Sequence, residues 1–287
     1  MTDPIQTVGI VGAGFMGSGI AEAVARAGFE VSLHEPAEAP LASSRERLGA
    51  SVAKAVEADK LSAREAQALQ GRIEWTTALE ALAPCQLVIE AVTEDPEVKT
   101  AVFRSLGELV APEALIASNT SSIPIAQLAA ATPHRERVLG LHFFSPAQVM
   151  RLVEVVVGID TAPEAVERAE AFCERIGKTP IRTKDRSGFI VNMLLVPYLM
   201  AGVRMYEEGF AARDAIDEGM RLGCGHPMGP LELADFIGLD VLYAVCNSLY
   251  EEFKRPEYAP PPLLKRMVVS GHLGRKSGRG FYEYDAA

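Results

Sequence analysis

Two residues that could move a proton together, His142 and Glu154, lie twelve positions apart in the chain. His142 is near the end of the apolar run "RVLGLHFF", and Glu154 is inside the next apolar run, "LVEVVV". Burying a carboxylate without a partner is costly. A glutamate that accepts a hydrogen bond from one imidazole nitrogen fixes the tautomer and leaves the other nitrogen for a substrate. The two residue types therefore indicate general acid–base chemistry.

The segment between these two residues could bring them together. Ser145, Pro146 and Ala147 follow the first run and could connect it to the second so that the two lie side by side. The spacing alone also leaves another interpretation open, in which His142 is a core histidine with satisfied hydrogen bonds and Glu154 faces solvent. The choice between these interpretations depends on what else the chain can bind.

A glycine-rich loop lies near the N-terminus, in "VGIVGAGFMGSGIAEAVARAGFEVSLHE". Gly12, Gly14 and Gly17 have G-x-G-x-x-G spacing between a predicted strand and a predicted helix, the context that makes this pattern informative. Gly12 permits a tight turn, Gly14 admits a pyrophosphate, and Gly17 lets the helix pack closely on the strand. Phe15 and Met16 lie inside the loop and are also predicted to contact the cofactor. The loop indicates a dinucleotide site at the helix N-terminus.

An acid follows this loop at the distance expected for a ribose contact. Glu35 ends the second predicted strand, and its carboxylate could accept from a 2′-hydroxyl while repelling a 2′-phosphate. No arginine follows until Arg45, so the pattern favours NAD over NADP. The alternative is an ordinary strand-to-helix turn beside a surface acid. A nicotinamide cofactor beside His142 would suit alcohol–ketone interconversion, with the hydroxyl proton passing to His142.

The elements that must hold these residues alternate between strand-like and helix-like segments. Apolar, β-branched runs predict strands, with helical segments between several of them, including a helical pair over residues 38–70. This alternation predicts an α/β fold, a Rossmann-type doubly wound domain with a mostly parallel sheet covered by helices. The predicted strands cover residues 7–12, 29–35, 72–76, 85–92, 114–118 and 137–144.

The pattern changes near residue 184, after which helical periodicity dominates. Residues 187–209 predict one long helix with Ser187 as a candidate N-cap and a kink at Pro197. A second helix is predicted over 213–223, capped by Asp214. The chain is therefore predicted to hold a dinucleotide-binding domain at 1–184 and an all-α domain at 185–287.

Composition excludes several classes of protein. The chain has 287 residues, 48% of them hydrophobic, and a net charge of −10, which argues against a nucleic-acid or anionic-membrane surface. Its four cysteines lack metal-type spacing, so no metal site is expected and the thiols are interpreted as reduced in the cytoplasm. The N-terminus lacks the basic region of a signal peptide, and the apolar segment 189–203 is too short to span a bilayer.

Eight motifs in the order of one known family cover residues 8 to 282. These are "VGAGFMGSGIA", "LVIEAVTED", "ASNTSS", "GLHFFSP", "MRLVEVV", "SGFIVNMLLVPYLM", "GHPMGPLELADFIGLD" and "GRKSGRGFY". With them the chain resembles the L-3-hydroxyacyl-CoA dehydrogenase family, and among its members the short 3-hydroxybutyryl-CoA dehydrogenases.

The resemblance implies roles for four residues. His142 matches the catalytic base and Glu154 the glutamate that orients it. Ser121 matches a serine that contacts the reacting oxygen of the substrate and lies near the cofactor, and Asn192 matches an asparagine that helps to hold that oxygen. Two neutral donors beside a carbonyl oxygen would polarise it for hydride attack. The alternatives are a turn or cap role for Ser121 and a backbone-satisfying role for Asn192 near Pro197.

The resemblance also implies cofactor contacts that the residues alone do not indicate. Glu94, Lys99 and Lys276 match positions that touch NAD. Without the resemblance, they would be interpreted as a solvated loop acid, an ordinary helix lysine and a solvated basic turn near the C-terminus.

Two further features concern the substrate and departures from the family. Ser51 matches a coenzyme A contact, while neither Lys54 nor Lys60 aligns cleanly with a phosphate-binding lysine.

The family usually has asparagine where this chain has Ser145, which is expected at the nicotinamide end of the site. The family often has arginine where this chain has Met193, so a domain contact or oligomer interface could differ.

The predicted function is reversible, NAD-dependent oxidation of an L-3-hydroxyacyl-CoA thioester, with 3-hydroxybutyryl-CoA the expected substrate and fatty acid β-oxidation the expected context. The resemblance implies a homodimer formed through the helical domain. Two alternatives are a related dehydrogenase of a free hydroxy acid and a non-catalytic NAD-binding protein on the same fold. Loss of His142 or Glu154 would mark the second alternative, and both residues are present.

Overall fold

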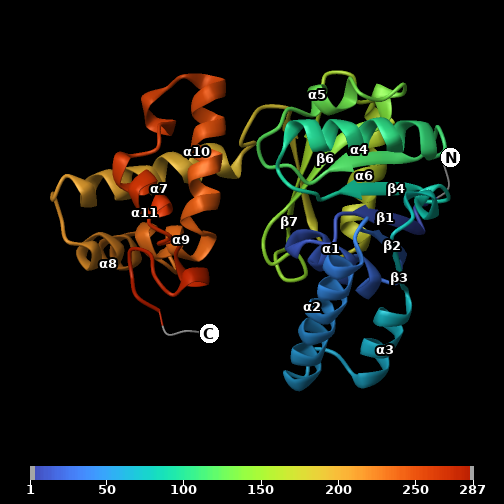
Figure 1. Cartoon of the computed structure of the whole chain (residues 1–287), viewed down its shortest axis with the longest axis horizontal. Helices are drawn as coiled ribbons and strands as arrows, with labels where there is room; N and C mark the ends of the chain where they lie inside the picture. The colour runs from blue at the N-terminus through green and yellow to red at the C-terminus, as the bar shows by residue number, and fades with distance from the viewer. Residues whose placement is uncertain (1–3, 285–287) are drawn as a thin grey trace. The chain divides into compact units, whose positions relative to one another are not determined.

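The computed structural model describes residues 4–284 of the chain. The chain divides into two compact units, Met1–Asp185 and Arg186–Ala287. The first contains a β-sheet with surrounding helices, and the second is built from helices (Figure 1).

The sheet of the first unit has eight strands in the order β3-β2-β1-β4-β5-β6-β7-β8. All neighbouring pairs are parallel except β6 and β7, which are antiparallel. Strand order reverses between β1 and β4, and in such sheets the ligand binds outside the carboxyl ends of these strands. The predicted Rossmann-type α/β fold is confirmed. The strands are β1 (Thr7–Val11), β2 (Glu30–His34), β3 (Ile73–Thr76), β4 (Leu87–Glu90), β5 (Leu115–Ser118), β6 (Val138–Phe143), β7 (Leu152–Val157) and β8 (Thr179–Lys184).

Two strands are absent from the six that were predicted: β7, whose sequence was recognised only as an apolar run, and the edge strand β8. The sequence of β8, TPIRTK, contains a proline and two basic residues, and most of its side chains are exposed or half-buried. An edge strand with little buried surface lacks the apolar pattern that identifies central strands. Only its pairing with β7 reveals it.

Within the described part of the first unit, residues 4–185, six α-helices connect the strands. Two have clear start signals: α3 begins after a capping box formed by Ser62 and Glu65, and α4 begins after Asp95, whose side chain accepts from the amides of Glu97 and Val98. The helices are α1 (Phe15–Arg26), α2 (Glu38–Glu57), α3 (Ala63–Gly71), α4 (Pro96–Leu109), α5 (Ile125–Ala129) and α6 (Pro163–Arg175), with short 3₁₀ turns η1 (Leu79–Leu82) and η2 (Arg135–Arg137).

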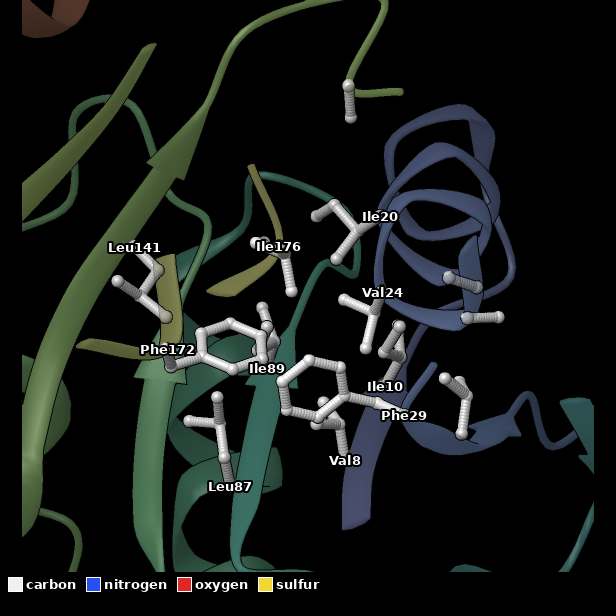
Figure 2. Close-up of a cluster of buried hydrophobic side chains, with 14 of the residues drawn as sticks. Val8, Ile10, Ile20, Val24, Phe29, Leu87, Ile89, Leu141, Phe172 and Ile176 are labelled. Carbon is white, nitrogen blue, oxygen red and sulfur yellow. The ribbon is translucent and has the colours of Figure 1, made fainter. Parts of the chain in front are cut away.

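The hydrophobic core on one face of the sheet joins α1 and α6 to the central strands. Ile20 and Val24 of α1 point toward the strands, and Phe172 of α6 meets Phe29 edge to face with ring centroids 5.4 Å apart (Figure 2). Each fully buried side chain of this size contributes about 1.5–3 kcal/mol. The core therefore holds the β1–α1 turn and β6 in one body. The labelled strand residues in Figure 2 are Val8, Ile10, Leu87, Ile89 and Leu141.

Over residues 186–284, the second unit has five α-helices around its own core. This core contains Val196, Leu199, Met200 and Val203 of α7, all buried. The elements are α7 (Val191–Glu207), α8 (Arg213–Cys224), α9 (Pro230–Ile237), α10 (Leu239–Phe253) and α11 (Pro262–Val269), with 3₁₀ turns η3 (Pro256–Tyr258) and η4 (Arg275–Ser277).

Three predicted helix boundaries in this unit are wrong. Ser187 is not an N-cap, because a turn precedes α7, which begins at Val191. Asp214 lies in the first turn of α8 and does not cap it. Helix α8 ends at Cys224, beyond the predicted end at residue 223, and its C-cap is Gly225. Gly225 has φ of 69°, a left-handed conformation that glycine adopts at little cost. Cap assignments depend on backbone dihedral angles, which composition does not reveal.

Two buried aspartates tie distant segments of the second unit together. Asp217 of α8 accepts hydrogen bonds of 2.8 Å from the amides of Leu231 and Glu232, at the start of α9. Asp235 of α9 accepts bonds of 2.9 Å from the amides of Phe281 and Tyr282. These bonds satisfy the first turn of α9 and hold the C-terminal segment against it.

Over residues 4–284, no single helix has the length and apolar content to cross a bilayer, and α9 with α10 passes that test only as a pair joined by a 98° bend.

Candidate active site

The turn between β1 and α1 explains why glycine occupies three of its positions. Gly12 has φ of 102° and donates its amide to the His34 carbonyl oxygen at 2.9 Å. A Cβ on Gly12 would lie 2.7 Å from the Ala91 carbonyl oxygen, and one on Gly17 would overlap the carbonyl of Gly12. Gly14 differs, because a Cβ there would meet no atom within 4 Å. The fold alone therefore requires Gly12 and Gly17, while Gly14 leaves space for something else.

The N-terminus of α1 offers its amide groups to that space. Gly14 is the N-cap and has no side chain to accept from them, and the first turn contains no acidic residue. Uncapped amides at the start of a twelve-residue helix form a site for an anion such as a pyrophosphate. Phe15, which is exposed, and Met16, which packs partly against the core, are the first two residues of this helix.

A groove of about 470 Å³ lies beside this turn. Glu35 reaches its rim from the end of β2, and its Oε2 accepts from the Ala13 amide at 3.1 Å. A groove lined by an acid and by apolar side chains suits the ribose and adenine of a dinucleotide. Its lining includes Gly12, Gly14, Glu35, Val92, Val98 and Val102.

Arg47 of α2 is a residue of this region that the sequence did not reveal. Its Nη2 donates to the Ala13 carbonyl oxygen at 2.7 Å and to Ser18 Oγ at 3.2 Å. The loop is therefore held from outside by a helix whose sequence looks like an ordinary charged surface. A basic residue on a mostly polar helix carries no signal of this contact before the chain is folded.

His142 and Glu154 lie directly opposite each other on the antiparallel strands β6 and β7. His142 Nδ1 and Glu154 Oε2 are 2.7 Å apart. His142 is 7% exposed and Glu154 is fully buried. The structure brings the predicted pair together, and their bond leaves Nε2 as the imidazole nitrogen that could exchange a proton with a substrate. The ring of Phe144 packs at 4.5 Å from that of His142, centroid to centroid.

The neighbouring strand ends are tied together by Asn119, another residue that the sequence did not reveal. Its Oδ1 accepts from the Phe143 amide at 2.9 Å. This bond joins the end of β5, and the turn that follows it, to the residue after His142. It fixes the base relative to the segment that carries Ser121.

Ser121 lies in the connection between β5 and α5, beside Glu94. Glu94 Oε1 accepts from the Ser121 amide at 2.8 Å, from Ser121 Oγ at 3.2 Å and from Thr120 Oγ1 at 2.6 Å. Burial acts to raise the pKa of Glu94, but the Lys99 ammonium and the bonds from Thr120 and Ser121 outweigh it, so the pKa lies below its ordinary value of 4.5. Glu94 is therefore a carboxylate at neutral pH, and the Ser121 hydroxyl is one of its donors.

Lys99 is almost fully buried, with 1% of its side chain exposed. Its Nζ lies 2.6 Å from Glu90 Oε1, 3.2 Å from Glu94 Oε2 and 3.4 Å from the Val92 carbonyl oxygen. The ammonium thus has two hydrogen bonds, to Glu90 and to the Val92 carbonyl, and an ion pair with Glu94. Glu90, at the end of β4, is fully buried, and it was not predicted from the sequence. The sequence did contain a signal for this buried pair, because Glu90 ends an apolar run and a lysine follows nine positions later.

The connection between β6 and β7 carries Ser145 and is held at two further points. Ser145 is exposed. Gln148 Nε2 donates to Ser51 Oγ of α2 at 3.2 Å, so the predicted coenzyme A contact touches this connection. The buried Lys178 donates to the carbonyl oxygens of Ala147 and Met150 at 2.6 and 2.8 Å. Burial lowers the pKa of Lys178, and the charge of Arg26 lowers it further.

Asn192 and Lys276 belong to the second unit. Asn192 is the second residue of α7 and is half-buried. Lys276, in η4, lies 2.6 Å from Asp240 Oδ2. The Sδ of the neighbouring Met193 accepts from the Tyr258 hydroxyl at 3.5 Å. Met193 therefore packs inside this unit.

Among residues 4–284, no group of three or more histidine, cysteine, aspartate and glutamate side chains could hold a metal ion. The four cysteines are free, and all but Cys224 are buried. Burial raises the pKa of the Cys85 thiol to about 11, which makes it unreactive at neutral pH.

Comparison with known proteins matches both units. The family model for "3-hydroxyacyl-CoA dehydrogenase, NAD binding domain" covers residues 7–186. The model for "3-hydroxyacyl-CoA dehydrogenase, C-terminal domain" covers residues 188–284.

Individual relatives match over nearly the whole chain. The 3-hydroxybutyryl-CoA dehydrogenase of Mycobacterium tuberculosis (strain ATCC 25618 / H37Rv) is 53% identical over 286 residues, which cover 99% of this chain and 100% of the relative. The crystal structure of M. tuberculosis FadB2 matches with a TM-score of 0.97 and 53% identity, covering 98% of this chain and 100% of that one. The structure of (S)-3-hydroxybutyryl-CoA dehydrogenase PaaH1 from Ralstonia eutropha matches with a TM-score of 0.93 and 42% identity, covering 98% and 100%.

Proposed function

Because the chain belongs to the 3-hydroxyacyl-CoA dehydrogenase family and is an NAD-dependent oxidoreductase, we propose that His142 and Glu154 move the proton of its hydroxyacyl substrate. The proposed substrate is L-3-hydroxybutyryl-CoA, which is oxidised reversibly at C3 to acetoacetyl-CoA. The observation that carries it is the buried bond of 2.7 Å between His142 Nδ1 and Glu154 Oε2. A carboxylate at that distance favours the charged imidazole that forms when the base takes a proton.

In the oxidation direction, His142 Nε2 takes the proton of the substrate hydroxyl. Bound NAD supplies the acceptor for the hydride that leaves C3. Glu154 holds the imidazole in one tautomer and stabilises its positive charge. In the reduction direction, the imidazolium returns the proton to the oxygen on C3. Removal of water from around the pair strengthens both interactions, and the two strands keep them aligned.

Ser121 is proposed to contact the reacting oxygen. Since its hydroxyl is a donor to Glu94 in this structure, its oxygen presents lone pairs that can accept from a substrate hydroxyl. To polarise a substrate carbonyl, the hydroxyl must turn away from Glu94. Rotating the hydroxyl breaks only its own bond of 3.2 Å to Glu94, since Glu94 keeps the shorter bond from the Ser121 amide. Asn192 is proposed as the second donor.

The cofactor residues are proposed from the shape of the β1–α1 turn. The amides at the start of α1 would hold the pyrophosphate, with Gly14 leaving it room, and Glu35 would accept from the ribose. The fit of a dinucleotide is supported by the open space at Gly14, since the backbone conformation there suits any residue. The other proposed cofactor contacts are Phe15, Met16, Glu94, Ser145 and Lys276.

The finer parts of the proposal concern the substrate and setting. Ser51 is proposed to contact coenzyme A, and the enzyme to act in the cytoplasm, in fatty acid β-oxidation, as a homodimer formed through the second unit. No nucleic acid or membrane enters the proposal, in line with the net charge of −10. A related dehydrogenase of free hydroxy acids is the alternative that the experiment separates.

The proposal is tested by reduction of acetoacetyl-CoA with NADH and NADPH in parallel, repeated with longer 3-ketoacyl-CoAs and with free acetoacetate. We expect turnover of the thioester with NADH and a much lower kcat/KM with NADPH, because Glu35 repels a 2′-phosphate. Equal rates with the two cofactors would show that Glu35 does not select between them. Preference for free acetoacetate would favour the alternative.

A further inference from the structure

We propose that the buried pair of Glu90 and Lys99 is a positioning device for Ser121, acting through Glu94. This inference rests on the proposed function, because Ser121 is the group that would meet the reacting oxygen. It gives Lys99 a positioning role in addition to the cofactor contact that the sequence resemblance implies.

The first argument is the place of the Lys99 ammonium between two acids. Its Nζ donates to Glu90 Oε1 at 2.6 Å and to the Val92 carbonyl oxygen at 3.4 Å, and it forms an ion pair of 3.2 Å with Glu94 Oε2. Only 1% of the Lys99 side chain is exposed, so the packing around it fixes its position. Its charge draws the Glu94 carboxylate into a defined place.

The second argument is that Glu90 reaches the Ser121 segment by two routes. Through Lys99 it fixes Glu94, whose Oε1 accepts from the Ser121 amide at 2.8 Å and from Ser121 Oγ at 3.2 Å. Through its own Oε2 it accepts from Ser118 Oγ at 2.7 Å, and that oxygen accepts in turn from the Thr120 amide at 3.1 Å. Both routes end at the turn that carries Ser121.

The third argument concerns cost. Glu90 is fully buried, and burying an acid with a lysine stabilises a fold little, because desolvation offsets their attraction. Apolar side chains could fill the same space at the end of β4. This pair lies beside the turn that carries Ser121. Its cost is better explained if it fixes the position of that turn, since small displacements of reacting groups reduce the rate strongly.

The test uses Glu90→Gln, which keeps the size of the side chain and removes its charge, and Ser118→Ala, which removes one of the two routes and leaves the ion pair. Each is made alone and together with Ser121→Ala. Reduction of acetoacetyl-CoA by NADH gives kcat and KM, quenching of protein fluorescence by NADH gives the cofactor Kd, and thermal unfolding gives Tm. Arg182→Met is the control, because Arg182 forms an exposed ion pair with Glu170.

We expect Glu90→Gln to lower kcat by roughly 10- to 100-fold, the range for a misplaced reacting group, with little change in the NADH Kd. In the Ser121→Ala background the same change should lower kcat only slightly further, because the group being positioned is gone. Ser118→Ala should show the same dependence on Ser121 with a smaller effect, and it carries the test if Glu90→Gln does not fold. The control should leave kcat unchanged.

Two results would overturn the inference. One is an unchanged kcat in a folded Glu90→Gln variant, which would mean that the pair does not position Ser121. The other concerns the double variants with Ser121→Ala. If the fold-decrease in kcat of a double variant equals the product of the two single fold-decreases to within about twofold, the two sites act independently. A wild-type protein without activity on acetoacetyl-CoA would instead refute the proposed function.

Discussion

At the scale of single residues, the proton-transfer pair depends on geometry that two strands impose. His142 and Glu154 are opposite each other in an antiparallel register, so their side chains leave the same face of the sheet. A shift of the register by one residue would send one side chain to the other face. The register therefore has as much influence on this chemistry as the residue types.

His142→Gln tests the role of the base. Glutamine keeps a polar side chain but cannot take a proton, so kcat for acetoacetyl-CoA reduction should fall by about 100- to 10,000-fold. NADH affinity should stay near that of the wild type, because His142 does not line the dinucleotide groove. Stopped-flow kinetics and a fluorescence titration measure the two quantities. A variant with near-normal turnover would refute the assignment.

Glu94 gives a prediction for stability against pH. Its unfolded pKa is close to 4.5 and its folded pKa is lower, so the unfolded chain binds the proton more tightly. The stabilisation is therefore complete above pH 4.5 and is lost as the pH falls below 4.5 through the folded pKa. In Glu94→Gln, the free energy of unfolding in urea should fall less steeply across this window. A steeper fall in the variant would contradict the prediction.

At the scale of elements, the strand–turn–helix unit of β1 and α1 separates glycines that the fold requires from a glycine that it does not. A Cβ on Gly17 would overlap the Gly12 carbonyl, while a Cβ on Gly14 would stand in open space with a backbone conformation that alanine adopts freely. The two positions look equivalent in the G-x-G-x-x-G motif. Their surroundings in the folded protein give opposite expectations for stability.

Alanine substitution at both glycines measures this difference. Gly14→Ala should keep the Tm of the wild type and lose affinity for NADH, because its methyl group occupies the space for the pyrophosphate. Gly17→Ala should lower Tm, because the first turn of α1 must move. Thermal unfolding and NADH titration are the measurements. If Gly14→Ala bound NADH as tightly as the wild type, the proposed place of the pyrophosphate would be wrong.

At the scale of the whole molecule, the second unit exposes several large apolar side chains. Leu194, Phe210, Leu222 and Val269 are each 73–79% exposed. Such side chains are often covered in an oligomer, although single exposed residues are common on any surface. They support the proposal that this unit forms the interface of a homodimer.

Light scattering after size-exclusion chromatography tests the dimer. The wild type should have twice the 30.8 kDa mass of the chain. Phe210→Glu and Leu222→Glu should shift the population toward monomer, because a charge would be buried without a partner. Ile159→Glu in the first unit is the control, since Ile159 is also strongly exposed. A monomeric wild type would refute the dimer.

The fold class and the cofactor followed from local patterns. Glycine spacing, the acid of Glu35 and apolar runs of strand length are properties of short segments, which carry their meaning before the chain is folded. The Rossmann-type fold, the family and NAD were all confirmed. The pair of His142 and Glu154 was also anticipated, because an acid inside an apolar run requires a partner and one suitable residue lay close in the chain.

Only the tertiary structure identified β8, the anchors Asn119 and Arg47, and the buried network beneath Ser121. These features depend on contacts between segments that are far apart in the sequence, and their residues look like ordinary surface positions. Lys99 on a charged helix reads as solvated, and folding instead buries it against Glu90 at the end of β4. Burial and register are set by the packing of the whole domain, so no single segment contains them.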